Sequence, residues 1–336
     1  PSNEKLVKVE IPDTVTSLGE AVFLSCTNLE YISIPSSVTQ IGSGCFKDGS
    51  DYGDYYTPKW YKNYVKNYKD DFVMINDVLL TYKGKASTIK LPKVKYIAGG
   101  AFSFNDNIKK VTIPEGYTEL SDEMFSWCKN LKSVSLPSTL KKINRYAFES
   151  TGITNISIPK KVIIIEQGAF DNSKLKNVVI PKNVKIIERD AFSCCHELEK
   201  VTISEGVEQI GTYAFYWCYN LKKIEIPSSV KKLDTSAFWR CYGLTSAVIK
   251  GNNLDISDTV FEECESLKDV VIYDGVTSIG DLTFAYCESL ESITIPDSVD
   301  FIHDRAFNES NDKLVFYCSK NSDAYYYARL KGFKIK

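Results

Sequence analysis

The sequence predicts a repeat solenoid, a fold in which one short unit is stacked many times along a single axis. The main observation is a phenylalanine that returns every 23 residues from Phe102 onward, with two steps of 22 around Phe170. The second is the phrase around it, L-x-x-I-x-I-P-x-x-V-x-x-I-x-x-x-A-F-x-x-C-x-x, which recurs with few changes. The repeat phenylalanines are Phe23, Phe46, Phe102, Phe125, Phe148, Phe170, Phe192, Phe215, Phe238, Phe261, Phe284 and Phe307.

The first half of each unit has the pattern of a β-strand. Around Ile224 and Ile226 apolar and polar residues alternate, as in a strand with one buried face, and Pro227 ends the strand because proline cannot donate to a ladder. One unit cannot bury its own apolar side chains, so neighbouring units must stack and form a parallel sheet with strands about 4.8 Å apart. We expect this sheet on the concave face of a curved solenoid. On the convex face, between Val230 and Phe238, we expect short extended, 3₁₀ or helical turns.

These residues carry a family resemblance. The repeated phrase resembles the BspA-like, or treponemal-type, leucine-rich repeat, and it covers nearly the whole chain. Residues 321–329, followed by Gly332-Phe333, are similar to the short terminal helix and strand that close many arrays of this family. The resemblance implies a right-handed superhelix, and it carries over no ligand-binding residue because the family phrase describes the core.

Two interruptions of the period define the expected organisation of the chain. Between Phe46 and Phe102 the gap is 56 residues, and the strand-like runs beside Asn76-Asp77 in this gap predict a hairpin. At Lys250-Gly251-Asn252-Asn253 the proline is lost, which indicates a local loop distortion. We expect N-terminal repeats at 1–46, an insertion at 47–88 with a hairpin at about 72–82, further repeats at 89–310 and a C-terminal cap at 311–336.

Composition excludes some classes of protein. The 336 residues include 41 Lys and Arg against 43 Asp and Glu, a balance that argues against a nucleic-acid partner. No apolar run approaches the roughly 18 residues of a membrane span. The sequence begins Pro1-Ser2-Asn3-Glu4-Lys5, without an initiator methionine, so we expect any signal peptide and any anchor to lie outside it.

The cysteines follow the repeat. Other repeats have Asn, Thr or Ser at the same position, so we expect a small side chain that bonds to loop backbone inside the stack. A ladder of buried free thiols is our main interpretation, with disulfides between rungs or a metal or redox role as alternatives. Seven of the ten cysteines stand three residues after a repeat phenylalanine, namely Cys26, Cys128, Cys195, Cys218, Cys241, Cys264 and Cys287.

Catalytic motifs are weak. Cys194-Cys195-His196 looks catalytic at first sight, but Cys195 belongs to the ladder, and a nucleophile needs an exposed thiolate and a positioned base. The sequence contains no H-E-x-x-H, G-x-S-x-G or kinase-like set of motifs. We therefore predict that the protein is not an enzyme and has no cofactor.

Three carboxylates in the insertion, Asp48, Asp51 and Asp54, could chelate a hard cation such as Ca²⁺. Their spacing does not match the D-x-D-x-D-G loop, and a solvated polar loop is the alternative. We predict no metal site.

The outward face of the sheet is the candidate binding surface. Its residues flank the middle aliphatic position of each strand and are mainly small and hydroxylated, with valines toward the C-terminal half. A broad polar strip suits a protein surface or an extended chain better than a buried small molecule, and a solvated sheet face is the alternative. The candidate ligand-binding residues are Tyr31, Lys110, Asn155, Asn177, Lys200, Lys223 and Asp269.

Charge and aromatic residues are unevenly distributed. Residues 129–186 carry eleven Lys and Arg against three acidic residues, whereas residues 252–312 carry fifteen Asp and Glu against two basic ones. This polarity could steer a partner, favour head-to-tail contact between molecules, or serve only solubility. Aromatic residues near the Phe-Cys turns are either binding hot spots or cover for the loop stack. They are Trp127, Tyr213, Tyr216, Trp217, Tyr219, Trp239 and Tyr242.

The resemblance implies a function in adhesion. BspA-like repeats occur in surface and secreted proteins of host-associated microbes, some of which adhere to matrix glycoproteins such as fibronectin or fibrinogen. We therefore expect an extracellular or cell-surface module that binds a host or neighbouring-cell protein. One alternative is a scaffold or spacer that self-associates through its exposed first strand, Leu6 to Ile11. Another is a carbohydrate-binding surface, for which Tyr31 is the clearest outward platform.

Overall fold

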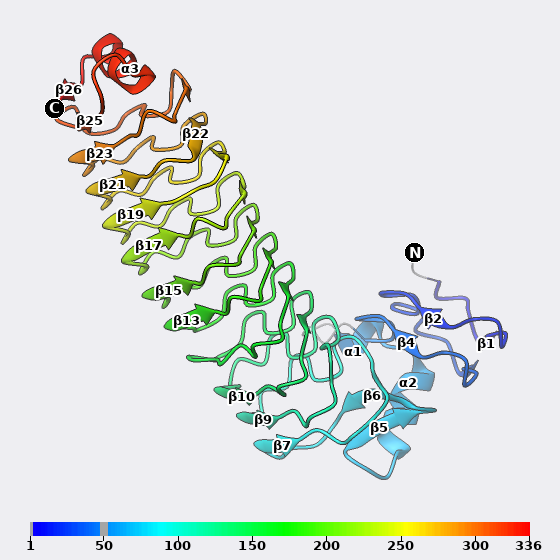
Figure 1. The fold of residues 1–336 in the computed structure, drawn as a ribbon. Coiled ribbons are helices and arrows are strands. Elements are labelled where there is room, and N and C mark those ends of the chain that lie inside the picture. Colours follow the sequence, from blue (N-terminus) through cyan, green and yellow to red (C-terminus); the bar gives the residue numbers. More distant parts are fainter. Residues whose placement is uncertain (1–2, 48–52) are drawn as a thin grey trace.

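The computed structural model describes residues 3–47 and 53–336, and it is a solenoid of short strands joined by turns (Figure 1). Each repeat forms one rung, and successive rungs stack along the axis with parallel strands. The apolar side chains of the repeats point inward and are buried. The predicted repeat solenoid with a parallel sheet is therefore confirmed.

The first sheet contains the strands that the alternating pattern predicted. In β17, Ile224 and Ile226 are buried while the two residues before them in the alternation are exposed. The chain then turns at Pro227, and the N–H of Val230 closes the turn by donating to the carbonyl of Pro227 at 3.1 Å. The strands in order are β13 (Asn177–Ile180), β15 (Lys200–Ile203), β17 (Lys223–Ile226), β19 (Ser246–Ile249), β21 (Asp269–Ile272), β23 (Ser292–Thr294), β25 (Val315–Tyr317) and β26 (Lys334–Ile335).

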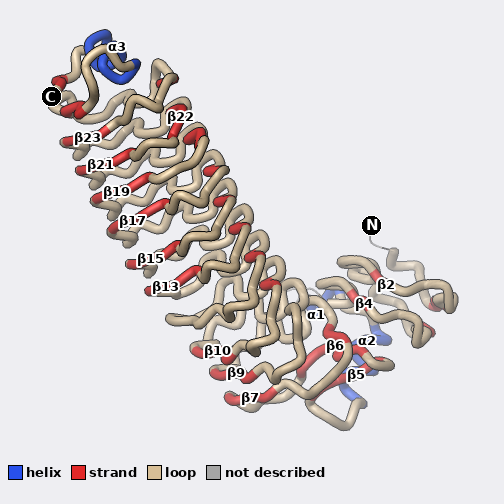
Figure 2. The backbone as a smooth tube through the Cα atoms, in the orientation of Figure 1, coloured by secondary structure: helices blue, strands red, loops and turns tan. Residues whose placement is uncertain are grey.

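A second parallel sheet lines the other side of the solenoid (Figure 2). Of the three conformations expected for this wall, the extended one is correct, and its pairing into a sheet was not predicted. Its register shifts between Leu254 and Asp255, directly after the loop 250–253 for which a distortion was predicted. The strands are β11 (Lys142–Ile143), β12 (Ile164–Ile165), β14 (Ile186–Ile187), β16 (Gln209–Ile210), β18 (Lys232–Leu233), β20 (Leu254–Ile256), β22 (Val276–Ile279) and β24 (Phe301–Ile302).

The repeat phenylalanines form a column between the two sheets and the Phe-Cys turns. Ten rings from Phe102 to Phe307 stack with centroids 5.1–5.7 Å apart, close to the spacing of strands in a sheet. From the repeat of Phe102 to that of Phe284, each turn bends through two left-handed residues, the second before and the second after the phenylalanine, as at Tyr213 (φ 58°) and Trp217 (φ 57°). The N–H of Trp217 donates to the carbonyl of Trp239 at 2.9 Å, so the turns are also joined from rung to rung.

The N-terminal part repeats the same architecture in smaller sheets. Two strands of the first type pair with each other, and so do two of the second type. A three-stranded sheet of the first type begins after the insertion. The strands are β1 (Lys8–Glu10) with β3 (Tyr31–Ser33), β2 (Ser17–Leu18) with β4 (Gln40–Ile41), and β7 (Thr88–Lys90) with β9 (Lys110–Thr112) and β10 (Ser133–Ser135).

The insertion contains helices as well as a hairpin. Strands β5 (Phe72–Ile75) and β6 (Val78–Tyr82) pair antiparallel within the range predicted for the hairpin, and β6 also pairs with β8 (Tyr96–Ile97). Two helices that the sequence analysis did not predict precede them, α1 (Gly53–Tyr56) and α2 (Lys59–Asn67). The ring of Tyr61 in α2 stacks on Phe46 at 5.5 Å. The helix thereby covers the phenylalanine column where the next repeat is missing.

The insertion divides the hydrophobic core into two clusters. Strand β6 lies between them, because Leu79 belongs to the large C-terminal cluster while its neighbours Val78 and Leu80 belong to the N-terminal one. The two stacks meet at Gly99, whose N–H donates to the carbonyl of Ile41 at 2.8 Å. Beside this contact lies a hollow of about 1170 Å³, between the N-terminal strands β2 and β4 and residues 93–97 and 115–122.

The C-terminal end is closed by a helix and a strand. Helix α3 (Asp323–Lys331) is capped by Ser322, whose hydroxyl accepts from the N–H of Tyr325, and it ends at the left-handed Gly332. Strand β26 then pairs with β25. The rings of Phe316 and Phe333 cover the end of the phenylalanine column.

Candidate functional surface

Five of the seven predicted ligand-binding residues share one row. The register of the first sheet places Asn155, Asn177, Lys200 and Lys223 in consecutive rungs, followed by Ser246 and Asp269. All five predicted residues are exposed. Neighbouring positions in this row are one strand spacing apart, about 4.8 Å. We call the outward residues of β13 to β23, together with Asn155, the ladder face.

The other two predicted residues lie in separate sheets. Lys110 stands in β9, between Thr88 and Ser133, outside the sheet that carries the ladder face. Tyr31 pairs with Lys8 in the N-terminal two-stranded sheet, and the Lys8 ammonium lies over its ring at 5.3 Å. The seven residues therefore do not form one continuous surface. The insertion interrupts the first sheet between β3 and β7, and the pairing lapses again between β10 and β13, where Asn155 bridges only to Asn177.

The second outward row of the ladder face is more apolar. Val179 is 60% exposed, and Val248 and Val271 are partly exposed in later strands. Polar residues of both rows make local contacts. In the second row Glu225 forms an ion pair with Lys250 at 2.5 Å, and in the first row the Ser292 hydroxyl donates to Asp269 at 2.7 Å. The face thus offers alternating charged, hydroxyl and methyl groups on a flat support.

The cysteine ladder is built into the stack. The thiol of Cys218 donates to the carbonyl of Phe192 in the preceding rung at 3.2 Å, so the predicted bond from this position to loop backbone is confirmed. All ten cysteines are free, and burial raises the pKa of Cys195 and of Cys241 to about 12. The same bond recurs at Cys128, Cys195, Cys241, Cys264 and Cys287.

The Cys194-Cys195-His196 run does not form a nucleophile and base pair. The Cys195 thiol is buried and donates to the carbonyl of Phe170 at 3.1 Å. The His196 ring instead turns outward and stacks on Tyr219, with centroids 4.6 Å apart. Cys194 is partly exposed, and burial raises its thiol pKa as well, which disfavours the reactive thiolate.

Two of the three carboxylates considered for a cation, Asp48 and Asp51, lie outside the described residues, and Asp54 falls within α1. In the described part of the chain, no group of three or more His, Cys, Asp or Glu side chains is arranged to hold a metal. Among residues 3–47 and 53–336, no helix has both the length and the apolar composition that crossing a membrane requires.

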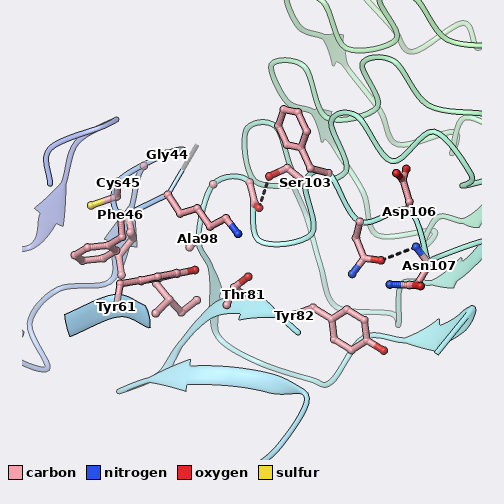
Figure 3. A pocket seen from close by; sticks show the side chains of 18 residues that line it. Gly44, Cys45, Phe46, Tyr61, Thr81, Tyr82, Ala98, Ser103, Asp106 and Asn107 are labelled. Atoms are coloured by element: carbon pink, nitrogen blue, oxygen red, sulfur yellow. Dashed lines mark hydrogen bonds between the residues drawn. The ribbon is translucent and has the colours of Figure 1, made fainter. Parts of the chain in front are cut away.

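A pocket of about 370 Å³ lies where the period is broken. Figure 3 shows Phe46 and Tyr61 on one side of it, Tyr82 beneath, and Ser103 and Asp106 on the other. It occupies the space between the turns of the Phe46 and Phe102 repeats. Its walls carry both aromatic rings and short polar side chains, and the sequence period alone did not predict it.

The aromatic turns form a connected patch. Tyr216 contacts Tyr213, Trp217 and Trp239, with ring centroids 5.1–6.0 Å apart, which supports their role as cover for the stack. Trp217 and Tyr219 are nevertheless 38% exposed each. Of the predicted aromatic residues, Trp127 lies apart from this patch, stacked on Phe104.

Two charged residues that the sequence analysis did not single out belong to the same patch. The Arg240 guanidinium lies over the Trp239 ring at 4.6 Å and pairs with Glu263 at 3.0 Å. Glu263 also accepts from the indole N–H of Trp239 and from the hydroxyl of Tyr242. Both residues stand two positions after a repeat phenylalanine, which is the signal that could have located them.

Parallel strands at a 23-residue period, a stacked phenylalanine column and turns bonded from rung to rung define a leucine-rich-repeat solenoid. A family model described as "BspA type Leucine rich repeat region" matches in six copies, at residues 2–64, 74–199 and 185–313. These matches cover well over half of the chain, which therefore belongs to the BspA-type leucine-rich repeat family. No curated protein has a significantly similar sequence.

Solved structures of bacterial proteins are similar to this chain to different degrees, and the first of them shares the fold. A leucine-rich repeat protein from Bacteroides ovatus is 24% identical, with a TM-score of 0.57, over 99% of this chain and 84% of that one. A leucine rich cell surface protein from Faecalibacterium prausnitzii is 24% identical over 95% and 89% of the two chains, with a TM-score of 0.44. The T. pallidum leucine-rich repeat protein is 22% identical over 64% and 84%, with a TM-score of 0.39.

Proposed function

We propose that the protein is a non-enzymatic, adhesin-like interaction module that binds a host or neighbouring-cell protein through its ladder face. The partner class is an extracellular-matrix or cell-surface glycoprotein. Membership of the BspA-type family supports this proposal. The proposal includes a location outside the cell or on its surface, where BspA-like repeats occur. Nucleic acid is a poor partner because the charges of the chain nearly cancel.

The observation that carries the proposal is the single exposed row from Asn155 to Asp269. It repeats amide, ammonium, hydroxyl and carboxylate groups at one strand spacing, about 4.8 Å. An extended partner segment that runs along the solenoid axis would meet one such group every rung. The valine row beside it supplies apolar contact area, which a protein partner needs for affinity.

Surface plasmon resonance against fibronectin, fibrinogen, collagen and laminin tests the proposal. The variant carries Lys200→Glu with Lys223→Glu. Its matched control carries Lys161→Glu with Lys182→Glu, which changes the net charge equally on exposed turns away from the ladder face. We expect saturable binding to at least one glycoprotein, weakened at least tenfold in the ladder variant and unchanged in the control.

Equal loss in both variants would mean that net charge, and not the ladder face, carries the binding. Binding that ignores both variants would move the site to the aromatic turns or the insertion. If none of the four glycoproteins binds, the matrix-adhesin proposal is wrong and a scaffold or spacer function takes first place.

A further inference from the structure

One surface of the main stack is basic at its N-terminal end, aromatic at its centre and acidic at its C-terminal end. It consists of the exposed residues at the second to seventh positions after each repeat phenylalanine, where the turn leads into the first sheet, apart from Asn155 and Asn177 of the ladder face. We call it the shoulder. At its centre, in the repeat of Phe215, stand Trp217 and Tyr219, each 38% exposed. His196 and Tyr242 occupy the position of Tyr219 in the rungs before and after it.

The N-terminal end of the shoulder is basic. In the three repeats of Phe125, Phe148 and Phe170, this surface carries four lysines and no acidic residue. All four lysines are exposed. Within the described residues only Lys174 forms an ion pair, with Glu197 at 3.5 Å. The four are Lys129, Lys132, Lys174 and Lys176.

The C-terminal end of the shoulder is acidic. The repeats of Phe261, Phe284 and Phe307 place six carboxylates there against Lys268 and Lys313. Glu263 pairs with Arg240, and Glu291 lies 4.0 Å from Lys268. The remaining four make no ion pair in the part of the chain that the structure describes, and they are Glu265, Glu288, Glu309 and Asp312.

We propose that the shoulder is the interface of an antiparallel, two-fold symmetric dimer of this chain, with the axis at the repeat of Phe215. Every rung rises by a nearly equal step, so this axis superposes each repeat before Phe215 on the repeat equally far after it. The repeat of Phe170 then faces the partner's Phe261 repeat, and that of Phe125 faces its Phe307 repeat. Two-fold interfaces are self-complementary in this way.

The pairing satisfies the charges that the single chain leaves without partners. Lys129 and Lys132 of one copy meet Glu309 and Asp312 of the other, and the contact occurs twice. The aromatic centre packs against its own symmetry mate, which places Trp and Tyr at the middle and charges toward the rim, as in stable interfaces. The strip spans eight rung steps, about 40 Å, which is long enough for an interface of the roughly 800 Å² per partner that stable complexes bury.

Compensating charge reversal tests the dimer. The first variant carries Lys129→Glu with Lys132→Glu, and the second carries Glu309→Lys with Asp312→Lys. In a homodimer each variant sets like charges against each other twice, whereas the mixed dimer pairs opposite charges at both contacts. Sedimentation velocity at low salt should give a dimer for the wild type. Each variant alone should dimerise with an affinity at least tenfold lower, and the dimer should recover when the two variants are mixed.

The matched control is Lys161→Glu with Lys182→Glu, which should dimerise like the wild type. Trp217→Ala should weaken the dimer at low and at high salt, because its contact is apolar, whereas the charge effects should shrink at high salt. The proposal is overturned if the wild type stays monomeric at about 100 μM, if the mixture fails to recover the dimer, or if a dimer forms that ignores both variants. The last result would assign it to another surface, such as the edge strand β1.

Discussion

Replacing Gly99 by alanine should loosen the N-terminal part of the solenoid from the main stack. A Cβ on Gly99 would lie 2.4 Å from the backbone nitrogen of Ser43 and 2.8 Å from its Cα. Both atoms belong to backbone that is held in the preceding stack, so no flexible side chain can move aside. Gly19 in the N-terminal part is the matched control, since its added Cβ would meet only Val22, at an ordinary 3.4 Å.

The magnitude follows from the overlap. An ordinary contact needs about 3.4 Å, so the two rungs must separate by about 1 Å. Overpacking of this kind costs about 1–3 kcal/mol. The separation also breaks the hydrogen bond from the Gly99 N–H to Ile41, which is worth about 1 kcal/mol. We expect a loss of about 2–4 kcal/mol, confined to the contact between the two hydrophobic clusters.

Hydrogen exchange read by mass spectrometry measures this loss locally. Amides of residues 16–46 should exchange about 30 to 1000 times faster in Gly99→Ala than in the wild type, because each 1.4 kcal/mol of opening free energy is a factor of ten. Amides of residues 200–250 should not change. If the amides of residues 16–46 exchange at the same rate in Gly99→Ala and in Gly19→Ala, the contact at Gly99 does not couple the two stacks and the reasoning fails.

Three further predictions concern the turns. Burial raises the pKa of Asp171 from 3.8 to about 7. The protonated carboxyl therefore contributes stability that is full below about pH 4 and is lost as the pH rises through 7. Thermal unfolding at pH 6 and pH 8 should show this loss in the wild type and much less of it in Asp171→Asn. Ala21 has a left-handed backbone (φ 53°), so Ala21→Gly should stabilise the protein by about 0.5–1 kcal/mol, whereas Ala86→Gly, at a position without positive φ, should destabilise it by a similar amount in urea unfolding. Iodoacetamide should label Cys194 and Cys318 in the native protein and leave the eight buried thiols unmodified, and rapid labelling of the buried set would contradict the closed ladder.

The insertion illustrates what the period leaves out. Trp60, Tyr61 and Tyr64 are spaced for one face of a helix, a signal that lies in the sequence but is short and outside the repeat. Its meaning depends on Phe46, whose ring has no following repeat to stack on and is covered by Tyr61 instead. This contact joins residues 15 positions apart, so it depends on the tertiary structure and cannot be predicted from the local pattern.

The candidate surfaces divide in the same way. The alternation around Ile224 was enough to predict which residues of each strand face outward, because one face of the sheet must be buried. It did not predict that Tyr31 and Lys110 would lie in separate sheets, since that depends on how the insertion displaces β3 from β7.

The sequence by itself determined the rung. A 23-residue period sets which side chains are buried, where proline turns the chain, and which residues share a column, because each rung can satisfy its backbone and its apolar groups only against a copy of itself. The tertiary structure decided the features that do not repeat along the chain. The bond between Gly99 and Ile41, the cover over Phe46 and the second sheet each depend on packing between segments that no local pattern relates.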